Sequence, residues 1–194
     1  MRWLPNILTL ARLLSVPLLV SLLVREYFAW AFWLFMAAGL SDALDGWLAR
    51  RYGTVGKLGA YLDPLADKAL LGACYLTLGV LDGLPGWLVV LVVSRDLMIL
   101  GGALALTCAG LRPRMEPLFV SKFNTLVQLA LVALVLARLA MPTWGGLAGA
   151  AAPVETAMIW LVAATTLASG LAYVAAGRRG AFRPGKSGPG GDDA

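Results

Sequence analysis

The sequence predicts an all-α integral membrane protein with six transmembrane helices, and three observations carry that prediction. Of the 194 residues, 60% are hydrophobic and 14% are charged, whereas soluble domains are about half apolar and about a quarter charged. Six apolar segments are each long enough for the roughly 20 residues that cross a bilayer. The Lys and Arg residues gather in alternate connections between these segments. Membrane lipid is therefore the solvent that this composition fits.

Short polar, glycine-rich or proline-rich stretches separate the six apolar segments. The helices are expected at 6–24, 28–49, 60–80, 86–110, 121–141 and 154–176. Arg25-Glu26 separates the first helix from the second, and a hairpin at 51–58 makes the second and third antiparallel neighbours. The other breaks fall at 81–85, 111–120 and 142–153. We therefore assign residues 1–176 to one transmembrane domain and 177–194, rich in Gly, Pro, Arg and Lys, to a disordered cytoplasmic tail.

Positively charged side chains fall on alternate sides of the expected helices. They crowd the connections after the second and fourth helices and the tail, whereas the first connection holds only Arg25 and the third and fifth hold none. The positive-inside rule places the crowded connections in the cytoplasm. Both termini are therefore expected there, which agrees with an even number of spans. Because the first helix starts within a few residues of Met1, we expect a bacterial cytoplasmic membrane and no transit peptide.

Residue types that are scarce in the chain exclude several classes of function. There is no histidine, which excludes serine–histidine triads, histidine metal ligands and phosphohistidine intermediates. Cys74 and Cys108 lie in apolar runs without a nearby Cys or His, and we expect both to be buried small hydrophobic residues. The net charge of +5 matches anionic lipid headgroups beside cytoplasmic loops and does not indicate nucleic-acid binding.

Four aspartates interrupt the second and third apolar segments. Asp42 and Asp45 are three residues apart and Asp63 and Asp67 are four apart, so each pair occupies one helix face. Across the hairpin, all four can face one another near the cytoplasmic side. Four carboxylates cannot stay ionised together without positive charge among them, and an all-oxygen set suits Mg²⁺, Mn²⁺ or Ca²⁺. We expect a site with room for two ions, as in phosphoryl transfer; a polar helix–helix network or a proton path is the alternative.

Small residues and one arginine lie beside the aspartates. Gly46 follows Asp45, Gly59 faces it across the hairpin, and Ala49 lies one turn further along. A small or missing side chain lets a flat nucleotide or a pyrophosphate approach the backbone, although small residues also let membrane helices pack closely. Arg50 adds a fork of hydrogen-bond donors for phosphate. Together these residues predict a phosphate-binding slot beside the metal site.

One stretch of the chain resembles the complete motif of the CDP-alcohol phosphatidyltransferase family: Asp42-x2-Asp45-Gly46-x2-Ala49-Arg50-x8-Gly59-x3-Asp63-x3-Asp67. Every fixed position of the motif is present and in order. The resemblance extends over most of the chain, from Pro5-Asn6-x-Leu8-Thr9-x-x-Arg12 to the sixth expected helix. It implies six transmembrane helices, usually in a homodimer, with a polar cavity that opens to the cytoplasm.

The family resemblance also implies a reaction and a role for each motif residue. A hydroxyl would attack the lipid-bearing phosphorus of a CDP-linked lipid and expel CMP. Two divalent ions, Mg²⁺ or Mn²⁺, would be held by Asp42, Asp45, Asp63 and Asp67. Asp67 would also be the general base, and a carboxylate is the base available to a chain without histidine. The CDP slot would be formed by Asn6, Thr9, Gly46, Ala49, Arg50 and Gly59.

Two further stretches resemble the eukaryote-type, CDP-diacylglycerol-dependent cardiolipin synthases of this family. They are Val93-Ser94-Arg95-Asp96-Leu97-Met98 and Phe119-Val120-Ser121-Lys122-Phe123-Asn124-Thr125-Leu126-Val127-Gln128, with Thr165-Thr166 late in the sixth helix. Related phosphatidylglycerophosphate synthases tend to have Gly-Arg-Glu in place of Ser94-Arg95-Asp96 and a basic residue in place of Asn124. The resemblance implies that CDP-diacylglycerol and phosphatidylglycerol are the substrates, with glycerol 3-phosphate or another small polar alcohol as the alternative acceptor.

Arg95, Arg112 and Lys122 are the residues expected to bind the acceptor phosphate. Alternatively, Arg95 and Asp96 form a self-neutralising pair inside the bundle, and Arg112 reflects only the positive-inside bias. Glycerol 3-phosphate is a dianion and should favour more cationic partners than a phosphodiester lipid with one charge. A third possibility is a transporter or scaffold that binds ions through the acidic hairpin. Transporters typically show paired interrupted helices in two halves, whereas this chain has one acidic hairpin.

Overall fold

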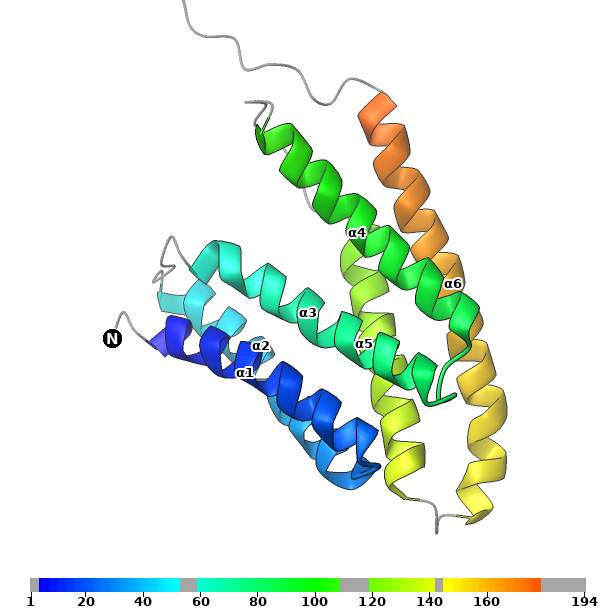
Figure 1. Cartoon of the computed structure of the whole chain (residues 1–194). Helices are drawn as coiled ribbons and strands as arrows, with labels where there is room; N and C mark the ends of the chain where they lie inside the picture. The colour runs from blue at the N-terminus through cyan, green and yellow to red at the C-terminus, as the bar shows by residue number, and fades with distance from the viewer. Residues whose placement is uncertain (1–3, 53–58, 109–118, 142–144, 179–194) are drawn as a thin grey trace, which may run out of the picture.

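The structure, a computed structural model, describes the backbone of residues 4–52, 59–108, 119–141 and 145–178. Side chains are described for 10–41, 68–102, 121–141, 152–173 and 175. Every regular element in the described ranges is an α-helix (Figure 1). The helices are α1 (Leu4–Val24), α2 (Phe28–Tyr52), α3 (Gly59–Val80), α4 (Gly86–Cys108), α5 (Phe119–Ala140) and α6 (Gly145–Arg178). The all-α class is confirmed, and six helices lie where six apolar segments were expected.

The bounds of α1 to α5 lie close to the expected ones, but α6 begins earlier than the sequence predicts. It starts at Gly145 and continues through Pro153, so most of the expected break at 142–153 is helical. Alanine, which fills much of 145–152, is the best helix former. Proline is tolerated inside membrane helices because local adjustments re-satisfy the freed carbonyl, and α1 likewise continues through Pro17.

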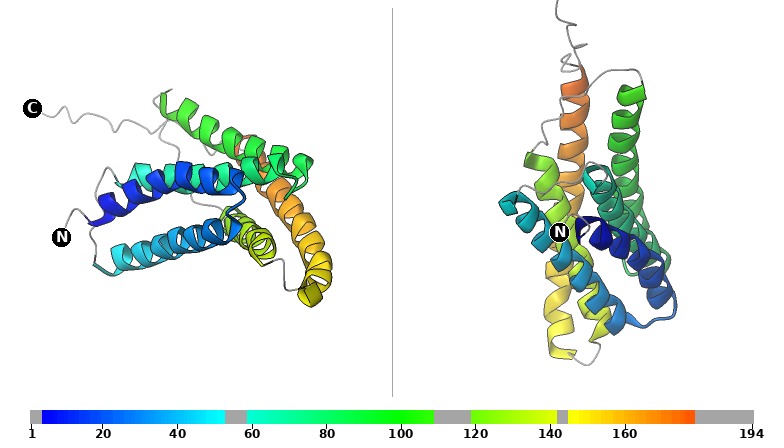
Figure 2. Two further views of the ribbon diagram at one scale, coloured as in Figure 1. Left: turned by 60° about the horizontal axis from the view of Figure 1, so that its bottom comes forward. Right: turned by 90° about the vertical axis from the view of Figure 1, so that its left-hand side faces the viewer.

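The helices form two groups of three, α1 to α3 and α4 to α6 (Figures 1 and 2). Within the first group α1 packs against α2 and α3, and within the second α6 packs against α4 and α5. The groups meet where α2 contacts α5 and where α3 contacts α4 and α5. Within the described part of the chain, α2 and α3 are therefore held together through α1 and α5, whereas the sequence predicted that they are direct neighbours.

Consecutive helices alternate in direction, which gives the bundle two distinct ends. The turns after α1 and α3 lie at one end with the last residues of α5 (Figure 1), and we call this the turn end. At the opposite end α2 stops and α3 starts, and we call it the motif end because the 42–67 stretch lies there. From their shared turn, α3 and α4 diverge toward the motif end (Figure 1).

Two similar helix caps form the turns at the turn end. Glu26 (φ 60°) and Asp82 (φ 55°) adopt the left-handed backbone conformation. The amide that follows each of them donates to the carbonyl five residues back: Tyr27 to Leu22 at 2.9 Å, and Gly83 to Leu78 at 2.8 Å. This is the six-to-one bond of a Schellman cap, which satisfies an orphan carbonyl and ends the helix. Both chain reversals are thus fixed by local hydrogen bonds.

Apolar side chains fill the centre of the bundle between α1, α3, α4 and α5. The fully buried large side chains of this core include Leu19, Leu23, Tyr75, Leu78, Leu88, Leu131, Val135 and Leu136. Most of these residues lie toward the turn end of their helices, where α3 and α4 are close together. The core therefore fixes the turn end, and the motif end is left for polar residues.

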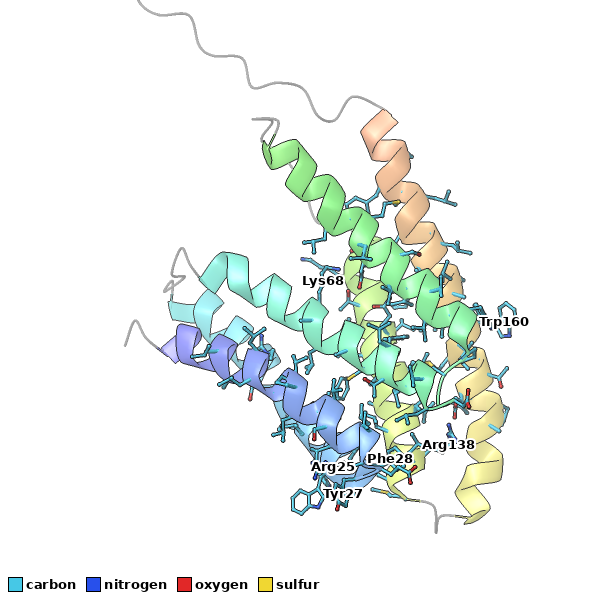
Figure 3. All side chains as sticks on the ribbon, in the orientation of Figure 1. Arg25, Tyr27, Phe28, Lys68, Arg138 and Trp160 are labelled. Atoms are coloured by element: carbon cyan, nitrogen blue, oxygen red, sulfur yellow. The ribbon has the colours of Figure 1, made fainter. Side chains whose placement is uncertain are left out.

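The outside of the bundle is also apolar. Val80, Trp30 and Leu171 are among many large hydrophobic side chains that are mostly exposed, and Trp160 points away from the bundle in Figure 3. Ser121–Ala140 and Ala152–Tyr173 are long and apolar enough to cross a membrane. Shorter apolar helical stretches occur at Leu10–Val24, Phe28–Ser41 and Lys68–Val80. Exposed apolar area of this extent is rare on water-soluble monomers.

Candidate active site

The aspartate motif lies on two helices at the motif end. The backbone is helical through Asp42 and Asp45 on α2 and through Asp63 and Asp67 on α3. The spacings of three and four residues therefore place each pair on one face of its helix. The side chains of all four residues lie outside the described part of the chain. Among the side chains that are described, no metal-binding group of three or more His, Cys, Asp or Glu residues occurs.

The residues expected to bind CDP fall on the same three helices. Asn6 and Thr9 belong to α1, Gly46, Ala49 and Arg50 to the last turns of α2, and Gly59 begins α3. The first turns of α1 lie at the motif end, near the end of α2 and the start of α3 (Figure 1). The side chains of these residues, and the whole of Arg112, lie outside the described residues, so Arg95 and Lys122 are the expected site residues whose side chains are described.

Lys68, which directly follows Asp67 in the chain, reaches from α3 to α4. Its Nζ lies 2.9 Å from Oδ1 of Asp96, and its side chain occupies the space between the two diverging helices (Figure 3). The Lys68 side chain is 33% exposed and that of Asp96 is 18% exposed. This ion pair connects the helix that carries Asp63 and Asp67 to the second group of helices.

Arg95 joins three helices from a buried position. Its Nη1 donates to Oδ1 of Asp96 at 2.5 Å, and its Nη2 donates to Oγ of Ser121 on α5 at 2.8 Å and to Oγ of Ser169 on α6 at 2.6 Å. The self-neutralising pair that was the alternative for Arg95 and Asp96 is present, but Asp96 also binds Lys68. The Nε atom of Arg95 is buried without a hydrogen-bond partner. A buried donor without a partner destabilises the folded state by about 1–3 kcal/mol unless a ligand or water accepts its hydrogen bond.

One turn further along α5, Asn124 is completely buried. Its Oδ1 accepts hydrogen bonds from the hydroxyls of Thr165 at 2.7 Å and Thr166 at 3.0 Å. Gln128, a further turn along, lies with its Nε2 3.5 Å from Oγ1 of Thr166. The Nδ2 atom of Asn124 is buried without a partner. Turning the amide over would give its N–H groups to the threonines and leave the carbonyl unpartnered, so one polar atom needs a ligand in either orientation.

These contacts form a continuous polar seam in the motif half of the bundle. We define the polar seam as Lys68, Arg95, Asp96, Ser121, Asn124, Gln128, Thr165, Thr166 and Ser169. It crosses from α3 to α4, α5 and α6, and two cations against one carboxylate leave it with one net positive charge. Lys122 is exposed on α5 beside Ser121. Buried polar networks of this kind are costly unless satisfied, and the two unpartnered atoms therefore indicate a place for a polar ligand.

Sequence reasoning found the stretches that contribute to the polar seam but not how they join. Arg95 was assigned to a ligand, whereas its Nη atoms hold three protein groups. Ser169 was missed altogether, and so was the link between Lys68 and Asp96. One signal was available: polar residues recur at three- or four-residue intervals on otherwise apolar helices, at 121, 124 and 128 on α5 and at 166 and 169 on α6. Such spacing places them on one helix face.

Comparison with known proteins agrees with the motif. The family model of the CDP-alcohol phosphatidyltransferases matches residues 2–168. The chain is 38% identical over 187 residues to the chloroplastic CDP-diacylglycerol–glycerol-3-phosphate 3-phosphatidyltransferase 1 of Oryza sativa, covering 88% of this chain and 55% of the relative. It is 35% identical over 192 residues to the CMP-forming cardiolipin synthase of Homo sapiens, covering 90% and 62% respectively.

A bacterial relative is matched over more of its length. A probable phosphatidylglycerophosphate synthase of Mycobacterium tuberculosis is 36% identical over 180 residues, which cover 89% of this chain and 80% of the relative. The chain spans a little over half the length of the rice and human relatives. Relatives named as cardiolipin synthases and relatives named as phosphatidylglycerophosphate-forming enzymes thus occur at similar identity. The choice of acceptor therefore rests on the chain's own residues.

Proposed function

The chain belongs to the CDP-alcohol phosphatidyltransferase family, and on that premise we propose that it makes cardiolipin from CDP-diacylglycerol and phosphatidylglycerol. The hydroxyl oxygen of the phosphatidylglycerol headgroup forms a bond to the phosphorus that carries the diacylglycerol. The bond from that phosphorus to the CMP oxygen breaks, and CMP leaves. The proton of the attacking hydroxyl goes to a carboxylate, so that the products are cardiolipin, CMP and a proton.

The motif aspartates are the proposed metal ligands and provide the proposed base. Asp42, Asp45, Asp63 and Asp67 offer only carboxylate oxygens, a hard donor set that fits Mg²⁺ or Mn²⁺. When bound, such ions neutralise charge on the pyrophosphate and on the departing CMP. Asp67 accepts the hydroxyl proton. The proposed CDP-binding residues are Asn6, Thr9, Gly46, Ala49, Arg50 and Gly59, of which Arg50 offers a planar fork of donors to phosphate.

The polar seam is the observation that carries the choice of phosphatidylglycerol. It holds one net positive charge and two buried polar atoms that lack partners, on Arg95 and Asn124. A phosphodiester with one negative charge balances this site, whereas the dianion of glycerol 3-phosphate would leave one charge uncompensated in a buried place, which is costly. We assign Nε of Arg95 to the acceptor phosphate and the amide of Asn124 to a headgroup hydroxyl, which can donate or accept.

Two further cations, outside the polar seam, are assigned to the approach of the acceptor and not to the acceptor site itself. Lys122 is exposed beside the polar seam, and Arg112 precedes α5 in the chain. We assign both to the approach of the anionic lipid headgroup, since exposed cations near the membrane surface attract such groups. An apolar route to this site is available because α3 and α4 diverge and carry apolar residues outward. Leu76 and Leu97, on these two helices, are both exposed.

We further propose that all six helices cross the membrane, with the motif end in the cytoplasm. The alternation of helix direction and the apolar exterior support this arrangement. Basic residues at the motif end support the orientation, whereas Arg138 at the turn end is paired with Glu155 at 2.8 Å. A bacterial cytoplasmic membrane is the proposed location. A homodimer is the proposed assembly, and the exposed apolar side chains of the outer faces leave area for it.

A phosphatidylglycerophosphate synthase is the second candidate, because the rice relative is named for glycerol 3-phosphate as acceptor. An acceptor screen separates the two. The purified protein in detergent is given CDP-diacylglycerol and Mg²⁺ or Mn²⁺ with either phosphatidylglycerol or glycerol 3-phosphate, and CMP and the lipid product are measured. Cardiolipin formation supports the proposal. Phosphatidylglycerophosphate formation overturns the choice of acceptor. If neither acceptor gives metal-dependent CMP release, or if no CMP is released at all, the transferase assignment is overturned.

A further inference from the structure

Asp96 holds two cations at once. Its Oδ1 lies 2.9 Å from Nζ of Lys68 on α3 and 2.5 Å from Nη1 of Arg95 on its own helix. The structure describes four acidic side chains. Of the other three, Glu26 and Asp82 lie in the two turns at the turn end, and Glu155 pairs with Arg138, which lies at the same end (Figure 3). In the motif half of the described residues, Asp96 is therefore the acidic side chain available to Lys68 and Arg95.

Lys68 is adjacent in sequence to Asp67, which the proposed function makes the base. An ammonium on a flexible four-carbon stem can form an ion pair with a carboxylate within its reach. A carboxylate held in that way has fewer lone pairs left to accept a substrate proton. A Lys68 released from Asp96 would have the motif aspartates as its next acidic partners in sequence. The ion pair to Asp96 keeps this cation engaged with α4.

Arg95 depends on the same carboxylate for its orientation. The guanidinium is 4% exposed, and its two Nη atoms are fixed by Asp96, Ser121 and Ser169. These three contacts determine where the unpartnered Nε–H is directed. Losing the Asp96 contact would leave a buried cation with two neutral hydroxyl partners, so its orientation would no longer be defined by charge.

From these contacts we propose that Asp96 is a positioning residue for the reaction: it keeps Lys68 away from the motif aspartates and orients Arg95 toward the acceptor. The inference rests on the proposed transferase function, and it holds for whichever acceptor the wild-type enzyme uses. Asp96 itself touches neither substrate. Loss of the Asp96 carboxylate should lower kcat because Lys68 is released, and should lower kcat/KM for the acceptor because Arg95 is no longer oriented. The KM for CDP-diacylglycerol should change little.

The test compares steady-state kinetics of the full-length enzyme carrying Asp96→Asn, Lys68→Met or both. Asp96→Asn should lower kcat/KM for the acceptor by about 30-fold or more, the range for truncating one partner of a buried charge pair. The KM for CDP-diacylglycerol should stay within about twofold, because a positioning effect on one substrate leaves the other's binding intact. Adding Lys68→Met should restore part of the lost kcat, since the released cation is then gone.

Two further variants control for structural damage. Asp96→Glu keeps the charge and should recover more activity than Asp96→Asn. Glu155→Gln removes a carboxylate from the ion pair at the turn end and should leave both kinetic constants unchanged. The proposal is overturned if the double variant is as slow as the product of the single losses, if both substrates lose affinity equally, or if Asp96→Asn lowers only thermal stability. If wild-type protein releases no CMP with any acceptor, the proposed function itself has failed.

Discussion

Two ion-paired clusters, one near the middle of α3 and α4 and one at the turn end, differ in what surrounds them. In the polar seam, Asp96 binds Lys68 and Arg95, and the Arg95 side chain is 4% exposed. At the turn end, Arg138 pairs with Glu155, and their side chains are 36% and 14% exposed (Figure 3). The two carboxylates are therefore buried to a similar degree, and the difference in burial lies in the arginines. The chemical groups are the same, but buried charge pairs are expensive to break, whereas exposed ones contribute little. The comparison teaches that burial decides which charges matter.

The packing around each cluster follows the same division. The turn end has capped helices, a dense apolar core and short chain reversals, so its geometry is fixed without help from charges. The motif half has diverging helices and polar side chains that bridge them, and two polar atoms there remain without partners. The proposed site, which would admit a lipid headgroup and a nucleotide, needs the second arrangement. The rigid end then serves as the frame on which the site is held.

The largest predicted effect is at the motif end, where Asp67→Asn should lower kcat by about 10²- to 10⁴-fold, the usual contribution of a general base. The amide has the shape of the carboxylate but cannot accept the proton. CDP-diacylglycerol binding, measured by equilibrium binding, should be retained. Asp82→Asn is the matched control at the turn end, since asparagine tolerates the left-handed backbone found there. Near-normal turnover in the Asp67 variant would remove this residue from the role of base.

The next effect concerns the acceptor. Asn124→Lys adds a positive charge at the completely buried centre of the polar seam and should shift the ratio of kcat/KM values toward glycerol 3-phosphate by about 10- to 100-fold, as expected for roughly 1–3 kcal/mol of discrimination. The measurement is product formation with both acceptors in competition. Thr125→Lys is the control, because the Thr125 hydroxyl donates to the backbone carbonyl of Ser121 on its own helix at 3.1 Å rather than to a side chain of the seam. An equal shift in both variants would contradict the assignment of Asn124.

At the turn end, Gly79→Ala should destabilise the fold without changing acceptor choice. A Cβ at position 79 would lie 2.8 Å from Cγ2 of Val89, a stiff side chain on α4, and overpacking of this kind costs about 1–3 kcal/mol. Gly72→Ala on the same helix meets nothing within 4 Å and should be neutral or slightly stabilising, because alanine favours helix. The midpoint of thermal unfolding in detergent checks both. If both variants behave alike, close packing of α3 on α4 is not what requires Gly79.

The sequence predicted the helices well because, for the membrane protein that we propose, lipid imposes a strong local rule. An apolar stretch of sufficient length must form a helix to satisfy its backbone, so five helices lie close to their expected bounds without knowledge of tertiary contacts. Pro153 misled the prediction, because proline breaks helices in water more reliably than it does in an apolar bundle. The aspartate motif was readable for the same local reason, since its residues lie on two consecutive helices.

The polar seam was not predictable in the same way. Lys68 and Asp96 are 28 residues apart and Arg95 and Ser169 are 74 apart, and no local pattern says which helices become neighbours. The interpretation of Arg95 as a phosphate ligand considered only its charge. Its partners on α5 and α6 depend on how the second group of helices packs, which is a property of tertiary structure.

The smallest predicted effect concerns the ion pair between Arg138 and Glu155 at the turn end. Glu155→Gln removes the charge that pairs with Arg138. The free energy of unfolding should fall by only about 0–1 kcal/mol, because the Arg138 side chain is 36% exposed and water can solvate its charge. Added salt should shrink the difference between variant and wild type further, because exposed charges are screened within about 10 Å at 0.1 M ionic strength. The thermal midpoint at low and high salt measures both effects. If Glu155→Gln lowers the thermal midpoint as much as Asp96→Asn does, the stability of both clusters depends on charge equally. Burial would then no longer explain why the polar seam matters.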